Sequence, residues 1–185
     1  MRYTHQSSRR SFLKFLISAA TATILPYPAL ATTSDYPSRP RLLAFYNIHT
    51  GESLDTVYWI HGKYVHEALV DINHILRDHR TGEMKTIDLR LLDFLYAIRL
   101  KLHALDPFHI ISGYRSTSTN ALLYGPDGGV ARNSLHLYGK AADITLPGSE
   151  ISLIQRAAIN LRGGGVGYYP EHGFVHVDVG RVRFW

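Results

Sequence analysis

Three stretches of the chain place apolar residues at helical spacing, which predicts three amphipathic helices. In the first stretch, Val65, Leu69, Ile72 and Leu76 recur every three or four residues and therefore share one helix face. We expect Asp88 and Ser149 to cap the second and third helix, because short polar side chains accept hydrogen bonds from the first free N–H groups. The predicted helices cover residues 65–77, 88–103 and 150–161.

Shorter apolar or alternating runs predict strands between and around these helices. The first two and the last two of these runs flank short turns and are expected to pair as hairpins. Between the middle runs, residues 117–133 are predicted to form a long polar loop, which in a compact domain is usually functional or mobile. This order of elements predicts an α+β fold, with helices packed on a mostly antiparallel sheet. The predicted strands cover residues 41–48, 54–60, 109–113, 141–145, 166–169 and 174–179.

Residues 1–31 have the three parts of an export signal in the right order. Arg9 and Arg10 lie in a pattern close to the twin-arginine type, and the apolar run over residues 15–25 is too short to span a bilayer. A small-x-small cleavage site follows at residues 29–31. We therefore predict twin-arginine export to the periplasm, a flexible leader over 32–40, a single domain over 41–185, and no integral membrane segment in the mature chain.

The positive charge of the chain belongs largely to that N-terminal segment. The net charge is +5, but residues 1–31 carry four of the 20 basic residues and none of the 15 acidic ones. The remaining 16 basic residues nearly balance the acidic ones, so a broad nucleic-acid-binding face is not expected. The chain also has no cysteine, which excludes disulfides and thiolate metal sites.

Two segments carry the residue types of a metal site. Residues 133–143 place His136 seven residues before Asp143, and residues 173–178 supply His176 and Asp178. Alternation along the last strand puts these latter two side chains together on the face opposite the apolar valines. Two histidines and a carboxylate can give a zinc ion three protein ligands and leave a fourth position for water, which is the arrangement of catalytic zinc sites.

Three motifs carry this chemistry, namely Ser-x-His-x-x-Gly-x-Ala-x-Asp over residues 134–143, Phe-Val-His-x-Asp over 174–178, and Ser-Gly-Tyr-Arg-Ser over 112–116. Together they resemble the motifs of the zinc D-Ala-D-Ala metallopeptidase family, which includes VanX-type dipeptidases and phage endolysin peptidases. Within this family the chain looks most like the murein endopeptidases. The resemblance implies a hedgehog/DD-peptidase-like fold and hydrolysis of peptide crosslinks in peptidoglycan, with its stem peptides as partners.

The resemblance also implies roles for individual residues. It places the zinc ligands at His136, Asp143 and His176, and a substrate-side arginine at Arg115, for which a structural salt bridge is the alternative. Arg115 would orient a substrate carboxylate or stabilise the oxyanion. The remaining substrate-binding candidates are Tyr114, Ser116 and Ser134.

The proton-transferring residue is less clear from the motifs. Several family members place an acidic residue or histidine two or three residues before the last ligand, where this chain has Phe174 and Gly173. We assign the general base to Asp178, with His172 and Glu171 as weaker candidates. The competing hypothesis makes Asp178 a partner that fixes the tautomer of the neighbouring zinc ligand. A non-catalytic, zinc-containing peptidoglycan-binding module is the alternative function.

Overall fold

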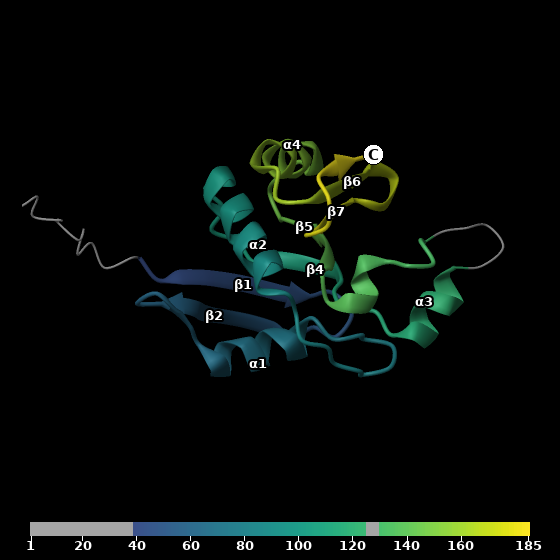
Figure 1. Cartoon of the computed structure of the whole chain (residues 1–185). Coiled ribbons are helices and arrows are strands. Elements are labelled where there is room, and N and C mark those ends of the chain that lie inside the picture. The colour runs from purple at the N-terminus through teal and green to yellow at the C-terminus, as the bar shows by residue number, and fades with distance from the viewer. Residues whose placement is uncertain (1–38, 125–129) are drawn as a thin grey trace, which may run out of the picture. The chain divides into compact units, whose positions relative to one another are not determined.

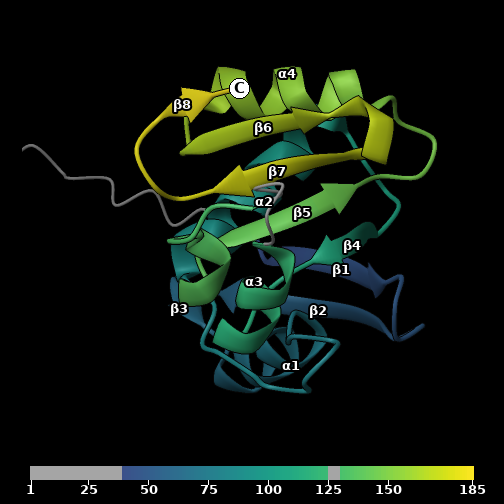
Figure 2. The ribbon, with the colours of Figure 1, turned by 90° about the vertical axis from the view of Figure 1, so that its right-hand side faces the viewer.

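A single sheet runs through the part of the chain that the structure, a computed structural model, describes, namely residues 39–124 and 130–185. Within these ranges its eight strands are β1 (Arg41–Asn47), β2 (Ser53–Ile60), β3 (Lys63–Tyr64), β4 (Phe108–Ser112), β5 (Ala141–Thr145), β6 (Gly165–Tyr169), β7 (Phe174–Asp178) and β8 (Arg183–Phe184). Their spatial order is β3-β2-β1-β4-β5-β7-β6-β8, and Figure 2 shows the larger strands side by side.

Most neighbouring strands in this sheet are antiparallel. Of the recorded pairings, β1 with β4 and β6 with β8 are parallel, and the others are antiparallel. The two hairpins expected from the sequence, β1–β2 and β6–β7, are both present. The predicted α+β class with a mostly antiparallel sheet is therefore confirmed.

The helices of the described residues lie on both sides of this sheet (Figures 1 and 2). They are α1 (His66–Ile75), α2 (Leu89–Leu102), α3 (Thr117–Leu123) and α4 (Ile151–Leu161), with two short 3₁₀ helices, η1 (Leu135–Tyr138) and η2 (Pro170–His172). The buried apolar residues of α1, α2 and α4 form one cluster with alternate residues of the strands, such as Val175 and Val177. The intervening strand residues, among them Asp143 and His176, therefore point to the opposite face.

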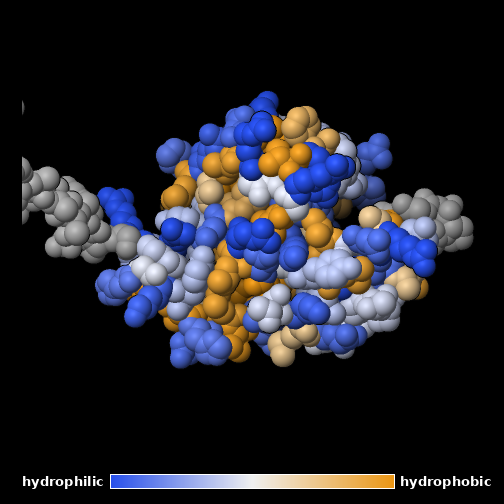
Figure 3. Space-filling model, in the orientation of Figure 1, coloured by the Kyte–Doolittle hydropathy of each residue, from blue (hydrophilic) through white to orange (hydrophobic). Residues whose placement is uncertain are grey.

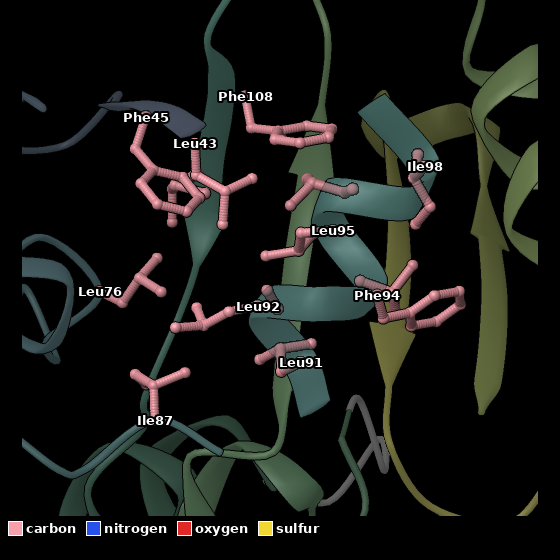
Figure 4. Packing of buried hydrophobic residues seen from close by; sticks show 14 of the residues in the cluster. Leu43, Phe45, Leu76, Ile87, Leu91, Leu92, Phe94, Leu95, Ile98 and Phe108 are labelled. Atoms are coloured by element: carbon pink, nitrogen blue, oxygen red, sulfur yellow. The ribbon is translucent and has the colours of Figure 1, made fainter. Parts of the chain in front are cut away.

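Helix α2 lies at the centre of this core. Figure 4 shows its leucines gathered with Phe45, Leu76 and Phe108, and each of these three side chains is fully buried. On the face of the molecule seen in Figure 3, most residues are hydrophilic, and hydrophobic residues reach the surface mainly between α1 and α2. The core thus packs against one face of the sheet, and we call the opposite face, which carries Asp143 and His176, the front face.

The two predicted helix caps have different outcomes. Asp88 caps α2 as expected, and its side chain accepts a hydrogen bond from the N–H of Arg90 at 3.0 Å. The prediction for Ser149 is wrong, because the capping position of α4 is Glu150, with no side-chain cap bond. Ser149 instead belongs to the preceding turn, where its N–H donates to the carbonyl of Leu146.

The prediction of a polar loop over residues 117–133 is wrong in its first half. Residues 117–123 form α3, which starts at the Ser116 cap, whose hydroxyl accepts from the N–H of Thr119 at 3.2 Å. The stretch is rich in Ser, Thr and Asn, which lowers its helix propensity, so the cap and tertiary contacts decide its structure. Residues 125–129 lie outside the described part.

The N-terminal predictions also concern residues outside the described part. Residues 1–38 are not described, so the export signal over 1–31 and most of the leader over 32–40 stay predictions. No helix in the described part of the chain combines the length and the apolar character needed to cross a membrane.

Candidate metal centre

Three side chains bring one potential ligand atom each to a common point on the front face of the sheet. Nε2 of His136 lies 3.2 Å from Oδ1 of Asp143 and 3.2 Å from Nδ1 of His176. The same Nδ1 lies 2.8 Å from the Asp143 oxygen. Among the described residues, these three form the one group of His and acidic side chains close enough to hold a metal ion.

The pairing of two core strands positions two of the three side chains. Asp143 of β5 stands directly opposite His176 of β7 in the antiparallel register, so both project from the same face at neighbouring points. Their chain neighbours are buried apolar residues that fix both strands from behind. The sheet therefore sets the distance between the carboxylate and the imidazole.

The third side chain, His136, comes from η1 directly before β5. Ser134 caps this short helix and accepts a hydrogen bond from the N–H of His136 at 3.4 Å. Gly139 ends the helix in the left-handed region, with φ of 64°. A side chain at Gly139 would also collide with the backbone of Thr86, so both the conformation and the close approach require glycine there.

A backbone carbonyl fixes the ring orientation of His136. Its Nδ1 lies 2.6 Å from the carbonyl oxygen of Gly113, at the end of β4. If Nδ1–H donates to that oxygen, Nε2 is left with a lone pair directed at Asp143 and His176. Histidines that bind metals commonly have such a partner on the second ring nitrogen, because it fixes tautomer and orientation.

The buried carboxylate of Asp178 fixes the ring orientation of His176. Nε2 of His176, on the ring edge opposite Nδ1, lies 3.2 Å from Oδ2 of Asp178. Asp178 is fully buried, and its carboxylate also accepts hydrogen bonds from the N–H groups of Gly165 and Gly180, at 3.1 and 2.8 Å. Arg183 donates through both terminal nitrogens, at 3.1 and 2.7 Å. Five donors thus surround this one carboxylate.

Glycines make room for this arrangement. A side chain at Gly164 would collide with the carbonyl group of Asp178, and one at Gly165 would collide with its carboxylate and with Arg183. Both glycines belong to a run of three, residues 163–165, that follows the end of α4 and leads into β6, where glycine also favours helix termination. Their second role is to let β6 approach the Asp178 carboxylate closely.

The charges of the cluster shift the protonation of its members. Although burial disfavours the imidazolium, hydrogen bonds to Asp143 and Asp178 raise the pKa of His176 to about 9. Burial alone would raise the pKa of Asp143, but the charges and hydrogen bonds of His136 and His176 hold it below its usual range. The cluster therefore favours ionised carboxylates beside a positively charged His176. A metal ion bound at the cluster would take the place of the His176 proton that faces Asp143.

The donor atoms suit a zinc-type ion. Bonds of about 2.0–2.1 Å at tetrahedral angles would separate ligand atoms by roughly 3.4 Å. The observed separations of 2.8 to 3.2 Å are close to that value and require only small outward movements of the side chains. Both imidazoles also have their second nitrogen occupied, by Gly113 and by Asp178. The residues therefore fit a metal bound by two nitrogens and one oxygen.

The three ligand atoms face a cavity of about 210 Å³ that opens to the surface. One side of this cavity is formed by aromatic residues, Tyr169, Phe174 and Trp185, with the Tyr169 and Phe174 rings stacked 4.7 Å apart. The other side includes Arg115 and Ser134. A ligand bound next to the three ligand atoms would thus meet aromatic rings and two cations, Arg115 and Arg183, the second of which lies over the Trp185 ring and is already paired with Asp178.

Arg115 is buried beside the carboxylate of Asp143. Its Nη2 lies 3.5 Å from Asp143 Oδ2, and its contacts with Ser112 and Asn120 are also long, at 3.4 and 3.5 Å. Within the described residues its Nε has no hydrogen-bond partner. Burial lowers the pKa of Arg115, which nevertheless stays a cation at neutral pH. A buried guanidinium with weakly used donors suits the binding of an anionic group.

The other residues predicted from the motifs lie in different places. Ser134 lines the cavity, whereas Tyr114 lines a neighbouring groove. Ser116 is fully buried as the cap of α3 and does not line the cavity. Glu171 and His172 lie on η2 and line a third hollow, which shares Tyr169 with the metal cavity.

Sequence motifs alone do not identify three residues of the cavity or its support. Tyr169 lies on β6, two residues beyond Gly167, which stands opposite His176 in the register. The alternation rule applied to β6 as well as to β7 would have placed Tyr169 on the same face. Arg183 lies in the short β8, for which the sequence has no clear strand signal, and Trp185 directly follows that strand. Trp185 donates through Nε1 to the Tyr169 hydroxyl at 2.9 Å.

Comparison with known proteins agrees with this geometry. The profile of a peptidase family described as "Peptidoglycan L,D-endopeptidase MepK" matches residues 35–185. The peptidoglycan L,D-endopeptidase MepK of Escherichia coli (strain K12) is 43% identical over 179 residues, which cover 97% of each chain. A probable peptidoglycan L,D-endopeptidase MepK of Haemophilus influenzae is 38% identical over 186 residues, covering all of this chain and 98% of the relative. The chain therefore belongs to the peptidoglycan L,D-endopeptidase MepK family of peptidases.

Proposed function

We propose that this protein is a murein endopeptidase that hydrolyses peptide crosslinks of the bacterial cell wall with the help of a bound zinc ion. The observation that carries the proposal is the convergence of His136, Asp143 and His176 at the base of an open cavity, in a member of this family. Both curated relatives are peptidoglycan endopeptidases by name. The substrate class is accordingly the stem peptides of peptidoglycan.

The donor set supports zinc as the metal. Two imidazole nitrogens and one carboxylate oxygen suit zinc, and three protein ligands leave a position that faces the cavity. When bound there, zinc would activate water and polarise the scissile carbonyl. The chain's own contribution is to hold the three ligands in place and to orient the peptide beside them.

Arg115 and the aromatic wall are the proposed substrate-orienting groups. The Arg115 guanidinium, with its unpartnered Nε, would bind a substrate carboxylate or the developing negative charge on the carbonyl oxygen. Tyr169 and Trp185 would pack against the peptide from the other side, where they also shield it from water. Ser134 lies near enough to the cavity to contact the peptide from the η1 side.

For Asp178 we propose the orienting role rather than the role of general base. A carboxylate has about four lone-pair positions, and five donors already surround this one. Its contacts with Arg183, His176 and Gly180 also hold the pKa of Asp178 below its usual range despite its burial. A fully engaged carboxylate of low pKa is a weak proton acceptor and a strong anchor for the imidazole.

Export to the periplasm completes the proposal. The cell-wall substrate lies outside the cytoplasm, and residues 1–31 have the pattern of a twin-arginine signal. Changing both Arg9 and Arg10 to Lys should leave the precursor in the cytoplasm. Periplasmic delivery of the double variant at the normal level would contradict the twin-arginine route and would leave the enzymatic proposal untouched.

Digestion of purified sacculi tests the enzymatic proposal directly. The mature protein with one equivalent of zinc should release peptides that identify a cleaved crosslink by mass spectrometry, and removal of zinc by a chelator should stop the release. The variant His136→Ala is the matched inactive control. A zinc-loaded protein that binds sacculi but releases nothing would instead be the non-catalytic peptidoglycan-binding module.

A further inference from the structure

A second hollow, larger than the metal cavity, lies directly beside it. This hollow, which we call the side groove, has a volume of about 530 Å³. Asn133 lines both the side groove and the metal cavity, so the two spaces are adjacent. The groove lies between α3 and η1, and its main side chains are Lys85, Tyr114, Tyr124, Arg132, Asn133 and Tyr138.

The backbone of residues 131–132 lies between the two spaces and is held by hydrogen bonds to α3. The side-chain amide of Asn120 on α3 donates to the carbonyl groups of both Ala131 and Arg132, at 3.3 Å each. Asn120 also lies 3.5 Å, through its Oδ1, from a terminal nitrogen of Arg115 in the metal cavity. Asn120, which is itself buried, thus connects α3, the 131–132 segment and the metal cavity.

The chemistry of the side groove is cationic and aromatic. Lys85 and Arg132 are exposed cations on its lining, and in the described part of the chain that lining includes no acidic residue. Two carboxylates lie near Tyr114, and neither is part of the lining. Asp78 is buried and accepts from the N–H groups of Arg80 and Ser116, whereas Glu83, two residues before Lys85, is exposed. The rings of Tyr124 and Tyr138 are about half exposed, at 46% and 52%.

The small volume of the metal cavity indicates that a substrate extends beyond it. Pockets that hold a ligand of moderate size measure about 300–1,000 Å³, so a cavity of about 210 Å³ holds only the groups next to the scissile bond. A peptide crosslink joins two stem peptides, so such a substrate continues away from the scissile bond as two arms. One arm needs a second binding space, and the side groove is adjacent and large enough.

We propose that the side groove binds the second stem-peptide arm of a crosslinked substrate, through the carboxylates of that arm. This inference rests on the proposed function. Stem-peptide carboxylates complement Lys85 and Arg132, and the aliphatic parts of the arm pack on the exposed tyrosine rings. Neutral sugars would gain nothing from the two cations, which favours the peptide over the glycan strand as the occupant. The groove thereby makes the enzyme prefer crosslinked over single stem peptides.

The test removes the two charges and compares two sugar-free substrates. The double variant K85Q/R132Q is measured on a crosslinked peptide dimer and on a short linear peptide that contains the same scissile bond but lacks the second arm. For the dimer, kcat/KM should fall by roughly 2- to 30-fold, because the two exposed charge pairs are individually weak. The short peptide should be cleaved at the normal rate, and high salt should reduce the difference seen with the dimer.

The matched control removes the same number of charges from the opposite face. K101Q/R156Q changes two exposed cations on α2 and α4, and both substrates should then be cleaved normally. An equal loss on both substrates in K85Q/R132Q, or no loss on the dimer, would overturn the proposal. Glycan-containing crosslinked fragments serve as a third substrate, and a loss of rate confined to these fragments would also overturn the proposal and would assign the groove to sugar.

A binding measurement separates this proposal from the proposed function. Calorimetric titration of metal-free protein with the dimer does not depend on turnover. The unsubstituted protein should bind the dimer more tightly than K85Q/R132Q does, and equal affinities would contradict the role of the groove. A zinc-loaded protein that binds the dimer in this charge-dependent way but cleaves neither peptide would contradict the proposed function alone.

Discussion

The guanidinium of Arg183 forms a two-pronged ion pair with the carboxylate of Asp178, which lies directly behind His176. The two bonds measure 3.1 and 2.7 Å, and the aspartate is completely buried whereas about a third of the arginine side chain is exposed. The ion pair therefore holds the carboxylate against the ring edge that faces away from the ligand cluster. It connects the last strand of the described chain to the geometry of the metal centre.

The variant Asp178→Asn distinguishes the two roles considered for this residue. If Asp178 orients His176, zinc affinity should fall by roughly 10–100-fold, and excess zinc should restore much of the activity. If it were the general base, zinc affinity should stay normal while turnover falls by roughly 10²–10⁴. Zinc affinity and turnover are therefore measured on the same preparation. Normal values of both quantities would contradict both roles and direct attention to His172 and Glu171.

The variant His136→Ala should lose both metal and activity. It removes one of three ligand atoms, and the two that remain cannot hold zinc tightly. Far-ultraviolet circular dichroism should stay close to that of the unsubstituted protein, because the ring lies on the front of the sheet and not in the apolar core. Metal content by mass spectrometry is the readout, and His172→Ala on η2 is the control that should keep one zinc. A full equivalent of zinc in His136→Ala would refute the ligand assignment.

Replacing Arg115 by Lys should separate charge from geometry. The lysine keeps a positive charge but loses the planar fork that binds carboxylates through two bonds. We expect kcat/KM to fall by roughly 10²–10³ in Arg115→Ala, and by a smaller factor in Arg115→Lys, with zinc content unchanged in both. Steady-state kinetics on a defined peptide measure this. If zinc is lost in step with activity, Arg115 acts mainly as a support for Asp143, which lies 3.5 Å away.

Stability in acid should depend on Asp78. Burial opposes its ionisation, but hydrogen bonds from Thr119, Ser116 and Arg80 hold the pKa of Asp78 well below its usual range. A pKa that is lower in the folded state adds stability that is fully present above the unfolded value of about 4, and this stability is lost progressively as the pH falls from there toward the folded value. Asp78→Asn should therefore destabilise the protein by about 1–3 kcal/mol at pH 7, and by less near pH 3.

Denaturant unfolding at both pH values measures this difference. Asp71→Asn, a change at an exposed residue of α1, is the matched control and should have little effect at either pH. An equal destabilisation of Asp78→Asn at pH 7 and pH 3 would show that the carboxylate contributes by packing and not by its charge. Because Asp78 accepts from the N–H of Ser116, the variant should also loosen the segment that includes Arg115.

Much of this architecture could be predicted from local patterns. The strand carrying Val175 and Val177 alternates so regularly that the exposed direction of His176 follows from the sequence alone. Asp88 is recognisable as a cap because it directly precedes an apolar stripe. These features depend on neighbours within a few residues, which the sequence displays directly.

Other features depend on contacts between distant segments and were not predictable in this way. The carbonyl of Gly113 orients His136 across 23 positions of the chain, and no periodicity encodes such a contact. Helix α3 was missed because its Ser and Thr residues have low helix propensity, and its cap is held by Asp78 from 38 positions away. The sequence likewise put Asp178 on the same strand face as His176 without revealing that Arg183 would enclose it.

The glycines beside Asp178 have a consequence for mutational studies of this protein. Gly164 and Gly165 contribute no atom to the chemistry, yet the added methyl group of an alanine would push on Asp178 and, through it, on His176. In a saturation screen selected for activity, both positions should therefore tolerate substitution as poorly as the metal ligands do. Such a screen would therefore identify the positions that must stay small so that the Asp178 carboxylate can contact His176, in addition to the residues that touch the peptide.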